Sequence, residues 1–290
     1  MPSITLLAPA KLNLVLDVLG KRPDGFHELR TVFERIGLCD TITLTANPHG
    51  PIRVTCDHPH VPKGPRNLAF RAARQIQQEY GVRQGVDIRI VKRIPVAAGL
   101  AGGSSNAAAV LMGVNRLWRL HLSQKRLARH AVRLGSDVAF FMYDTPFALG
   151  TGRGEKIRPL RARTKLWHVL VTPKVKMYTK EVFARLTRKA KSLKLTKKRD
   201  NVNICLPYLR KGDFQGLGAV LSNDLEPSIL SLRPDLVRLK KKLSDAGAAG
   251  VCFSGSGPSV FALASGRAQA ESIKDGFDKR FTQVFVVPTL

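Results

Sequence analysis

The chain has few features that would direct it to a membrane, to an oxidising compartment or to a metal ion. None of its apolar segments approaches the length of about 20 residues that a membrane-spanning helix needs. Its first residues carry no basic region, and Lys11, Asp17 and Lys21 interrupt any signal-like apolar run. The four cysteines lie far apart, without a Cys-x-x-Cys pair or the spacing of a zinc site. We therefore expect a soluble cytoplasmic protein with reduced thiols and no membrane association.

Acidic residues are also scarce. There are 21 Asp and Glu against 48 Lys and Arg, which gives a formal net charge of +27. Basic runs lie at 158–165, 189–199 and 238–242. Such a charge is typical of nucleic-acid-binding proteins, and it would also speed the encounter with phosphorylated small molecules. Aromatic residues make up only 7% and are not interleaved with the basic runs, which argues against binding of single strands. Our main interpretation is a solvated basic surface, and the other two stay open.

Strand and helix signals are mixed along 290 residues, a length sufficient for one large or two modest domains. Alternating apolar residues predict strands at 4–7, 13–18, 41–46 and 52–56, and the turn between the last two indicates a hairpin over 41–56. N-cap residues begin helices at Asn67 and Ser123, and Gly81 and Gly135 end them.

The second half shows the same mixture. Strands are predicted at 147–150, 167–172, 251–253, 260–263 and 284–287, and helices at 180–186, around Leu206 and Leu217, and at 235–246. Without a regular parallel repeat, this pattern indicates the α+β class. We place a domain boundary in the basic linker, which gives domains 1–160 and 161–290.

The segment from Pro95 to Asn106 is rich in glycine and joins a predicted strand (86–90) to an alanine-rich helical run (107–118). Glycines let the backbone approach a ligand, and the helix that follows directs its free N–H groups at the same point. This combination predicts a phosphate-binding loop. It lacks the Gly-Lys-Ser/Thr of a Walker A loop, and the chain lacks the protein-kinase motifs and a full Gly-x-Gly-x-x-Gly fingerprint.

Three motifs together resemble a known kinase family. Pro-x-x-x-Gly-Leu-x-Gly-Gly-Ser-Ser is similar to the nucleotide loop of the galactokinase, homoserine kinase, mevalonate kinase and phosphomevalonate kinase (GHMP) superfamily. Ala8-Pro-Ala-Lys11-Leu-Asn13-Leu and Arg22-Pro-Asp-Gly-Phe26-His27 resemble more closely the family of 4-diphosphocytidyl-2-C-methyl-D-erythritol kinases, which serve the non-mevalonate isoprenoid route. The resemblance covers nearly the whole chain and is weak at about 185–200.

The resemblance implies a fold, a reaction and partners. The fold would be a two-domain α+β GHMP-kinase fold, with an N-terminal ribosomal-protein-S5-like nucleotide-binding domain and a C-terminal ferredoxin-like α/β sandwich. The reaction would transfer a phosphoryl group from ATP, with Mg²⁺, to the 2-hydroxyl of a cytidine-diphosphate-linked methylerythritol. We expect a monomer or weak homodimer without nucleic acid. Another GHMP-type kinase, or a nucleic-acid-binding protein on a degenerate kinase fold, stays open as an alternative.

Lys11 and Asp137 are the expected catalytic residues. On its own, Asp137 in Gly135-Ser-Asp137-Val could be a helix cap, and Lys11 could be a surface lysine. The resemblance instead implies that Asp137 accepts the proton of the attacking hydroxyl and that Lys11 stabilises the oxyanion.

ATP binding is assigned by the resemblance to the loop, mainly through its backbone N–H groups, and to two flanking polar residues. The loop residues are Pro95, Val96, Ala97, Ala98, Gly99, Leu100, Ala101, Gly102, Gly103, Ser104 and Ser105. Asn67 and Lys92 are expected near the adenine or ribose, although a helix cap and an exposed strand lysine are the ordinary alternatives. Relatives often have glycine where this chain has Ala98 and Ala101. Because alanine disfavours a positive φ, we expect the glycines of the loop, Gly99, Gly102 and Gly103, to supply the left-handed turns.

Substrate recognition is expected from residues in two separate motifs. By the resemblance, Phe26 and Phe183 would sandwich the cytosine, with His27 at its edge, and Phe26 stands where the family has tyrosine. Asn13 and Thr179 would contact the diphosphate or erythritol. The turn 254–258 resembles a third superfamily motif that approaches the substrate. No acidic Mg²⁺ ligand can be assigned from the sequence.

Overall fold

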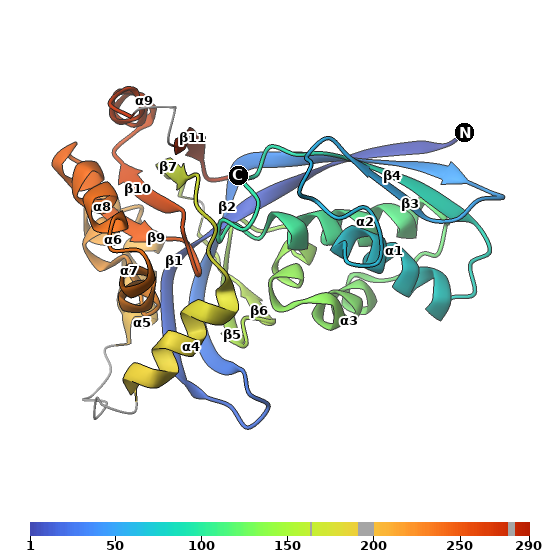
Figure 1. Cartoon of the computed structure of the whole chain (residues 1–290), viewed down its shortest axis with the longest axis horizontal. Coiled ribbons are helices and arrows are strands. Elements are labelled where there is room, and N and C mark those ends of the chain that lie inside the picture. The colour runs from blue at the N-terminus through green and yellow to red at the C-terminus, as the bar shows by residue number, and fades with distance from the viewer. Residues whose placement is uncertain (163, 191–199, 278–281) are drawn as a thin grey trace.

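The structure is a computed structural model of the whole chain, and it describes residues 1–162, 164–190, 200–277 and 282–290. Most of the predicted basic run 189–199 therefore lies outside the described residues. Two long strands, β1 (Ser3–Lys21) and β2 (His27–Asn47), run through the middle of the molecule. In Figure 1, α1 to α3 lie on one side of these strands and α4 to α9 on the other.

The first sheet has seven strands and is built on β1 and β2, which pair antiparallel along their whole length. Its remaining strands are β3 (Arg53–Cys56), β4 (Gly85–Val91), β5 (Phe147–Gly152), β6 (Lys156–Pro159) and β8 (Ser222–Asn223). The hairpin predicted over 41–56 is wrong, because β4 lies between β2 and β3 and pairs with both. An alternating apolar pattern satisfies either neighbour in a sheet, so the local sequence does not choose the partner.

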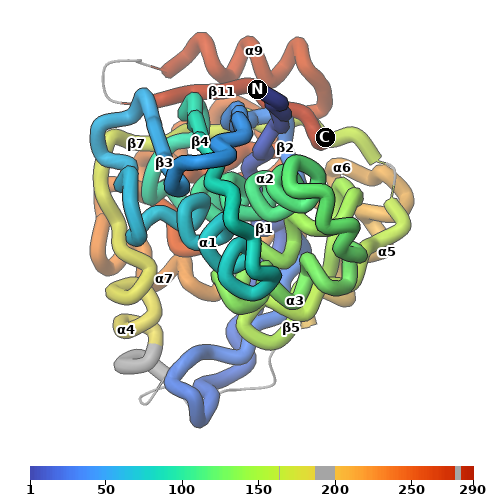
Figure 2. Tube along the Cα trace, turned by 90° about the vertical axis from the view of Figure 1, so that its right-hand side faces the viewer, coloured from blue at the N-terminus to red at the C-terminus, as the bar shows by residue number. Residues whose placement is uncertain are grey.

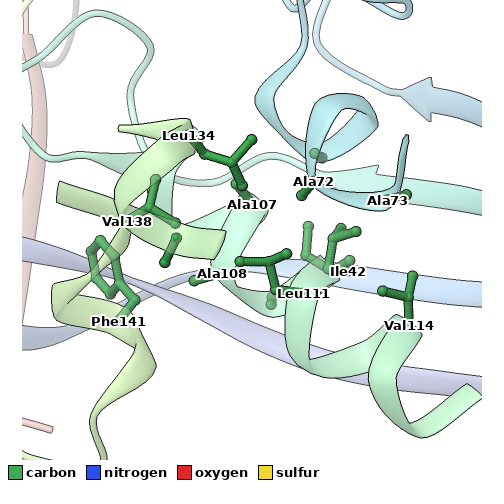
Figure 3. Packing of buried hydrophobic residues seen from close by; sticks show 14 of the residues in the cluster. Ile42, Ala72, Ala73, Ala107, Ala108, Leu111, Val114, Leu134, Val138 and Phe141 are labelled. Carbon is green, nitrogen blue, oxygen red and sulfur yellow. The ribbon is translucent and has the colours of Figure 1, made fainter. Parts of the chain in front are cut away.

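Three helices pack on this sheet. They are α1 (Leu68–Glu79), α2 (Gly102–Leu117) and α3 (Gln124–Leu134). The predicted caps are confirmed, since Asn67 and Ser123 accept hydrogen bonds from Ala69 N and Arg126 N. Figure 3 shows small residues of α1 and α2, such as Ala72 and Ala108, packing with Ile42 of β2. These alanines let the helices approach closely and hold α2 rigidly under the predicted loop.

The second sheet has four antiparallel strands in the order β11-β7-β10-β9. The strands are β7 (Trp167–Pro173), β9 (Gly250–Phe253), β10 (Val260–Ala264) and β11 (Thr282–Pro288). Helices α4 (Thr179–Ala190), α5 (Asn201–Lys211), α6 (Phe214–Val220), α7 (Glu226–Leu232) and α8 (Leu236–Asp245) come between β7 and β9, and α9 (Arg267–Asp275) precedes β11. The resulting βαββαβ arrangement is the expected ferredoxin-like pattern.

The two sheets are joined by buried contacts. β8 pairs in parallel with Val15 and Leu16 of β1, so a late segment of the chain completes the first sheet. Because of this pairing, the sheets do not separate at a single point in the sequence, and the division at residue 160 stays a prediction. Glu34 of β2 is fully buried and contacts His168 Nε2 of β7 at 2.9 Å. Thr289 Oγ1 donates to the same carboxylate at 2.6 Å.

In both Figure 1 and Figure 2, the tip of the β1–β2 hairpin lies beside α4. The predicted substrate motifs at 26–27 and 179–183 are therefore neighbours in space. Across the described residues, no helix combines the length and apolar character needed to cross a membrane.

Candidate active site

A cleft of about 1120 Å³ lies where the two parts of the molecule meet. Its walls come from β1, β2, the loop before α2, the 3₁₀ turn Ser136–Val138, α4 and the turn at 255–256. Every predicted site residue except Ser105 lines this cleft. The sequence motifs thus converge on a single cavity, although they are up to about 170 residues apart in the chain.

Lys11 is a buried cation on β1, with 3% of its surface exposed. Its Nζ donates to Asn13 Oδ1 at 2.6 Å and to the carbonyl oxygen of Gly99 at 2.9 Å. Burial lowers the pKa of Lys11 below its ordinary value, and the charge of Asp137 acts in the opposite direction. The ammonium therefore has two neutral acceptors and one nearby negative charge, an arrangement that favours contact with a further anion.

Asp137 belongs to the 3₁₀ turn that follows the end of α3 at Gly135. It is partly exposed and lines the cleft. Among the described side chains that line the cleft, Asp137 is the only carboxylate. A single acid opposite a buried lysine can accept a proton from a bound hydroxyl without creating a negative field around anionic ligands.

The loop before α2 takes left-handed conformations at Ala97 (φ 55°), Gly99 (φ 76°) and Ala101 (φ 55°). The expectation that Gly102 and Gly103 supply such turns is wrong, because both begin the right-handed helix α2. Gly99 is required for a second reason. A Cβ added there would lie 2.1 Å from the carbonyl oxygen of Ser254, so the second part of the molecule packs directly on this residue.

The residues expected to contact ATP differ in how they are placed. Ser104 lines the cleft, whereas Ser105 is buried and its Oγ has no partner among the described residues. Asn67 is the N-cap of α1, and its Nδ2 also donates to the Pro62 carbonyl at 2.6 Å. Lys92 lines the cleft, but its ammonium is ion-paired with Asp40. Both residues thus have structural partners in addition to any nucleotide.

The expected cytosine-binding residues gather at the hairpin tip and on α4. The rings of His27 and Phe183 lie 5.0 Å apart between centroids and are tilted by 33°. Phe26 is about half exposed, and the Arg153 guanidinium lies 4.6 Å from its ring centroid. Burial and the charge of Lys21 hold the pKa of His27 below its ordinary value, which keeps the ring neutral near pH 7.

Asn13 and Thr179 line the same cleft. Asn13 Nδ2 donates to Thr31 Oγ1 at 2.8 Å, which fixes its amide so that Oδ1 faces Lys11. Thr179 Oγ1 lies 2.9 Å from Ser256 Oγ, so the start of α4 is bonded to the turn that resembles the third motif. Thr31 and Ser256, which hold these two side chains in place, also line the cleft.

The cleft is strongly positive. Among the described residues, six cationic side chains line it: Lys11, Lys21, Arg66, Lys92, Arg153 and Lys180. Within the described parts of the chain, no group of three or more His, Cys, Asp or Glu is placed to hold a metal ion. The cleft is therefore suited to polyanions such as nucleotide phosphates.

Arg153 is a candidate site residue that sequence reasoning missed. It stands between Gly152 and Gly154, both with positive φ, in a tight turn after β5. The Gly-Arg-Gly sequence signals that turn, but only the tertiary structure places it over Phe26.

The comparisons with known proteins agree with this geometry. The model described as "GHMP kinases N terminal domain" matches residues 67–145, and "GHMP kinases C terminal" matches residues 205–283. These matches define a two-domain α+β kinase of the GHMP class, which uses ATP.

Full-length relatives narrow the class. The 4-diphosphocytidyl-2-C-methyl-D-erythritol kinase of Bacillus velezensis is 44% identical over 97% of this chain and 94% of its own length. That of Geobacter metallireducens is 45% identical over 96% of each chain. A crystal structure of 4-(cytidine 5'-diphospho)-2C-methyl-D-erythritol kinase has a TM-score of 0.80 and 32% identity, covering 98% of both chains. The chain belongs to the 4-diphosphocytidyl-2-C-methyl-D-erythritol kinase family.

Proposed function

We propose that the protein transfers the γ-phosphoryl group of ATP to the 2-hydroxyl of 4-diphosphocytidyl-2-C-methyl-D-erythritol, giving the 2-phosphate and ADP. The observation that carries this proposal is that Lys11 and Asp137 line one cleft together with the nucleotide loop and Phe183 of α4, with Asp137 close enough for its charge to act on Lys11. Family membership supplies the substrate class, and the cleft supplies residues for each part of the reaction.

The chemistry at the acceptor follows from these two side chains. Asp137 takes the proton of the substrate's 2-hydroxyl, while the oxygen of that hydroxyl forms a bond to the γ-phosphorus. The bond between the γ-phosphorus and its bridging oxygen breaks, and ADP carries that electron pair away. The Lys11 ammonium lies next to Asn13 Oδ1 and the Gly99 carbonyl, where it can stabilise the oxygen as it becomes negative.

The phosphates of ATP would be held by backbone N–H groups at the start of α2, which begins at Gly102 directly after the loop. The Ser104 hydroxyl is the cleft group suited to Mg²⁺, which would take its remaining ligands from phosphates and water. When bound, Mg²⁺ would neutralise charge on the transferred group. Asn67 and Lys92 border the expected adenosine side.

The cytidine end would bind at the hairpin tip. A base can stack on Phe183 or Phe26, and the neutral ring of His27 can form a hydrogen bond with the cytosine edge. Stacking does not need the phenol oxygen that this chain lacks at position 26. Arg153 covers one face of Phe26 and brings a positive charge toward the diphosphate.

A coupled assay of ADP release tests the proposal. The cytidyl methylerythritol should be phosphorylated, whereas mevalonate, homoserine and galactose should not, and phosphorus NMR should locate the new ester on the 2-hydroxyl. Asp137→Asn should lower kcat roughly 10²–10⁴-fold and leave binding of an ATP analogue nearly unchanged. Turnover of a simple sugar or amino-acid alcohol in preference would sink the proposal, and activity of Asp137→Asn within a few-fold of the parent would remove the assigned base.

A further inference from the structure

Asp40 is a fully buried carboxylate on β2 that does not line the cleft. Its Oδ1 accepts hydrogen bonds from the backbone N–H groups of Arg93 and Ile94, each at 2.8 Å. Its Oδ2 accepts from Asn106 Nδ2 at 2.8 Å and pairs with the Lys92 ammonium. Four donors therefore converge on one side chain.

These donors come from the two segments that flank the nucleotide loop. Lys92, Arg93 and Ile94 form its entry after β4, and Asn106 lies in the first turns of α2 at its exit. The two segments are tightly packed at this point, because a Cβ added to Gly102 would lie 3.0 Å from both Lys92 Nζ and Ile94 Cγ2. Asp40 thus joins the beginning and the end of the loop through one carboxylate.

A buried charge with four donors is a rigid arrangement, because the loss of any partner leaves polar groups unpaired inside the protein. The loop between the two segments has strained positions at Ala97 and Ala101, which persist only if the surroundings hold them. We propose that Asp40 is a positioning residue for ATP: it holds the entry and exit of the nucleotide loop so that the N–H groups before and at the start of α2 face the phosphates. This inference rests on the proposed function for the identity of the ligand.

The proposal also assigns a role to Lys92. Only 4% of its side chain is exposed, and its ammonium contacts Asp40. Lys92, which also lines the cleft, therefore acts mainly as the cationic partner that compensates the buried charge.

Glu34 provides a matched control. It lies on the same strand, is equally buried, and accepts hydrogen bonds from His168 and Thr289. Its partners belong to β7 and the C-terminal residues and not to the nucleotide loop. Asp40→Asn and Glu34→Gln therefore remove comparable buried charges, but only the first loosens the loop.

The test measures initial rates against each substrate and, independently of catalysis, the affinity for a non-hydrolysable ATP analogue by calorimetry. Asp40→Asn should raise the KM for ATP and the analogue Kd about tenfold or more, because charge-assisted hydrogen bonds are lost, while the KM for the cytidyl substrate changes less than about threefold. Glu34→Gln should lower the melting temperature without this selective change. Asp40→Glu keeps the charge, protects folding, and should give a smaller rise in the analogue Kd.

Equal changes in both KM values, or an unchanged analogue Kd in folded Asp40→Asn, would overturn the positioning role. If Asp40→Asn does not fold, an analogue Kd for Asp40→Glu equal to that of the parent would overturn it. A parent enzyme that binds the analogue but does not phosphorylate the cytidyl substrate would instead overturn the proposed function, and the calorimetric comparison would still decide the role of Asp40.

Discussion

Lys11 is a buried lysine whose direct hydrogen-bond partners are neutral oxygens. Desolvation disfavours its charged form, so the folded protein holds this proton less tightly than the unfolded chain does. Between the lowered pKa and 10.5, the unfolded chain binds more protons, and stability therefore rises with pH across that interval. At lower pH the full cost of burying the charge is present. This cost suggests that the lysine is retained for its charge and not for stability.

If the Lys11 ammonium stabilises the oxyanion, kcat/KM for the cytidyl substrate should fall on the alkaline side with an apparent pKa below 10.5. Lys11→Arg should keep reduced activity and move this fall to higher pH, because a guanidinium stays charged. The measurement is a pH profile at saturating ATP. Lys241→Met, on an exposed part of α8, serves as the control and should leave the profile unchanged. An alkaline fall that is the same in Lys11→Arg as in the parent would assign it to another group.

Phe183 contributes a ring that already contacts His27. Phe183→Ala should raise the KM for the cytidyl substrate far more than the KM for ATP, since stacking a base on an aromatic ring contributes about 1–3 kcal/mol. Phe183→Tyr keeps the ring and should remain close to the parent. The two KM values from one set of initial rates suffice, and an unchanged cytidyl KM would show that Phe183 serves only to pack α4.

At the scale of elements, the loop from Pro95 to Ala101 depends on a contact with the other part of the molecule. The Ser254 hydroxyl donates to the Gly99 carbonyl at 3.0 Å, and the same carbonyl accepts from Lys11. The loop from Pro95 to Ala101, Lys11 and the turn before β10 are therefore connected through one peptide group. A substitution in any of the three should therefore alter the binding of the ATP phosphates.

Gly99→Ala should raise the KM for ATP and lower the melting temperature, because the added Cβ meets the backbone oxygen of Ser254 and the residue has a positive φ. Ala101→Gly is the matched control. It relieves a left-handed alanine at the cost of chain entropy, so its stability should stay within about 1 kcal/mol of the parent. Thermal unfolding and steady-state kinetics check both. A Gly99→Ala enzyme with parental KM and melting temperature would contradict the close approach.

At the scale of the whole molecule, the charge of +27 surrounds a cleft lined by six cations and one acid. Such a field attracts anionic substrates before they bind. It has little influence on phosphoryl transfer between substrates that are already bound. The charge should therefore affect association more than turnover.

Raising KCl should lower kcat/KM smoothly by several-fold and change kcat little, because salt screens exposed charges beyond a Debye length of about 8 Å at physiological ionic strength. Initial rates over a salt series measure this, and sucrose at matched viscosity controls for slower diffusion. A flat salt dependence would contradict electrostatic steering. Tight, salt-sensitive binding of RNA or DNA by the same protein would favour the nucleic-acid interpretation of the charge.

Local sequence determined the elements whose signals are local. The caps at Asn67 and Ser123, the helix that begins after the glycines and the strands of the second sheet follow from side-chain hydrogen bonds and apolar periodicity over a few residues. The motifs around Lys11, His27 and Asp137 identified the family, because they carry residue types in a fixed order. These features need no knowledge of distant contacts.

Only the tertiary structure decided which strands pair and which polar groups are buried together. β4 separates β2 from β3, and β8 returns to β1, because strand partners are chosen by the burial of whole faces and not by neighbouring residues. Ala97 and Ala101 take left-handed conformations, although alanine by itself disfavours a positive φ, so the local sequence does not predict them. Likewise, Asp40 and Arg153 gained partners more than 50 and 120 residues away in sequence, and no local pattern marks such pairs. A charge such as that of Asp40 can be buried only where its donors are assembled around it, which happens only when the complete fold forms.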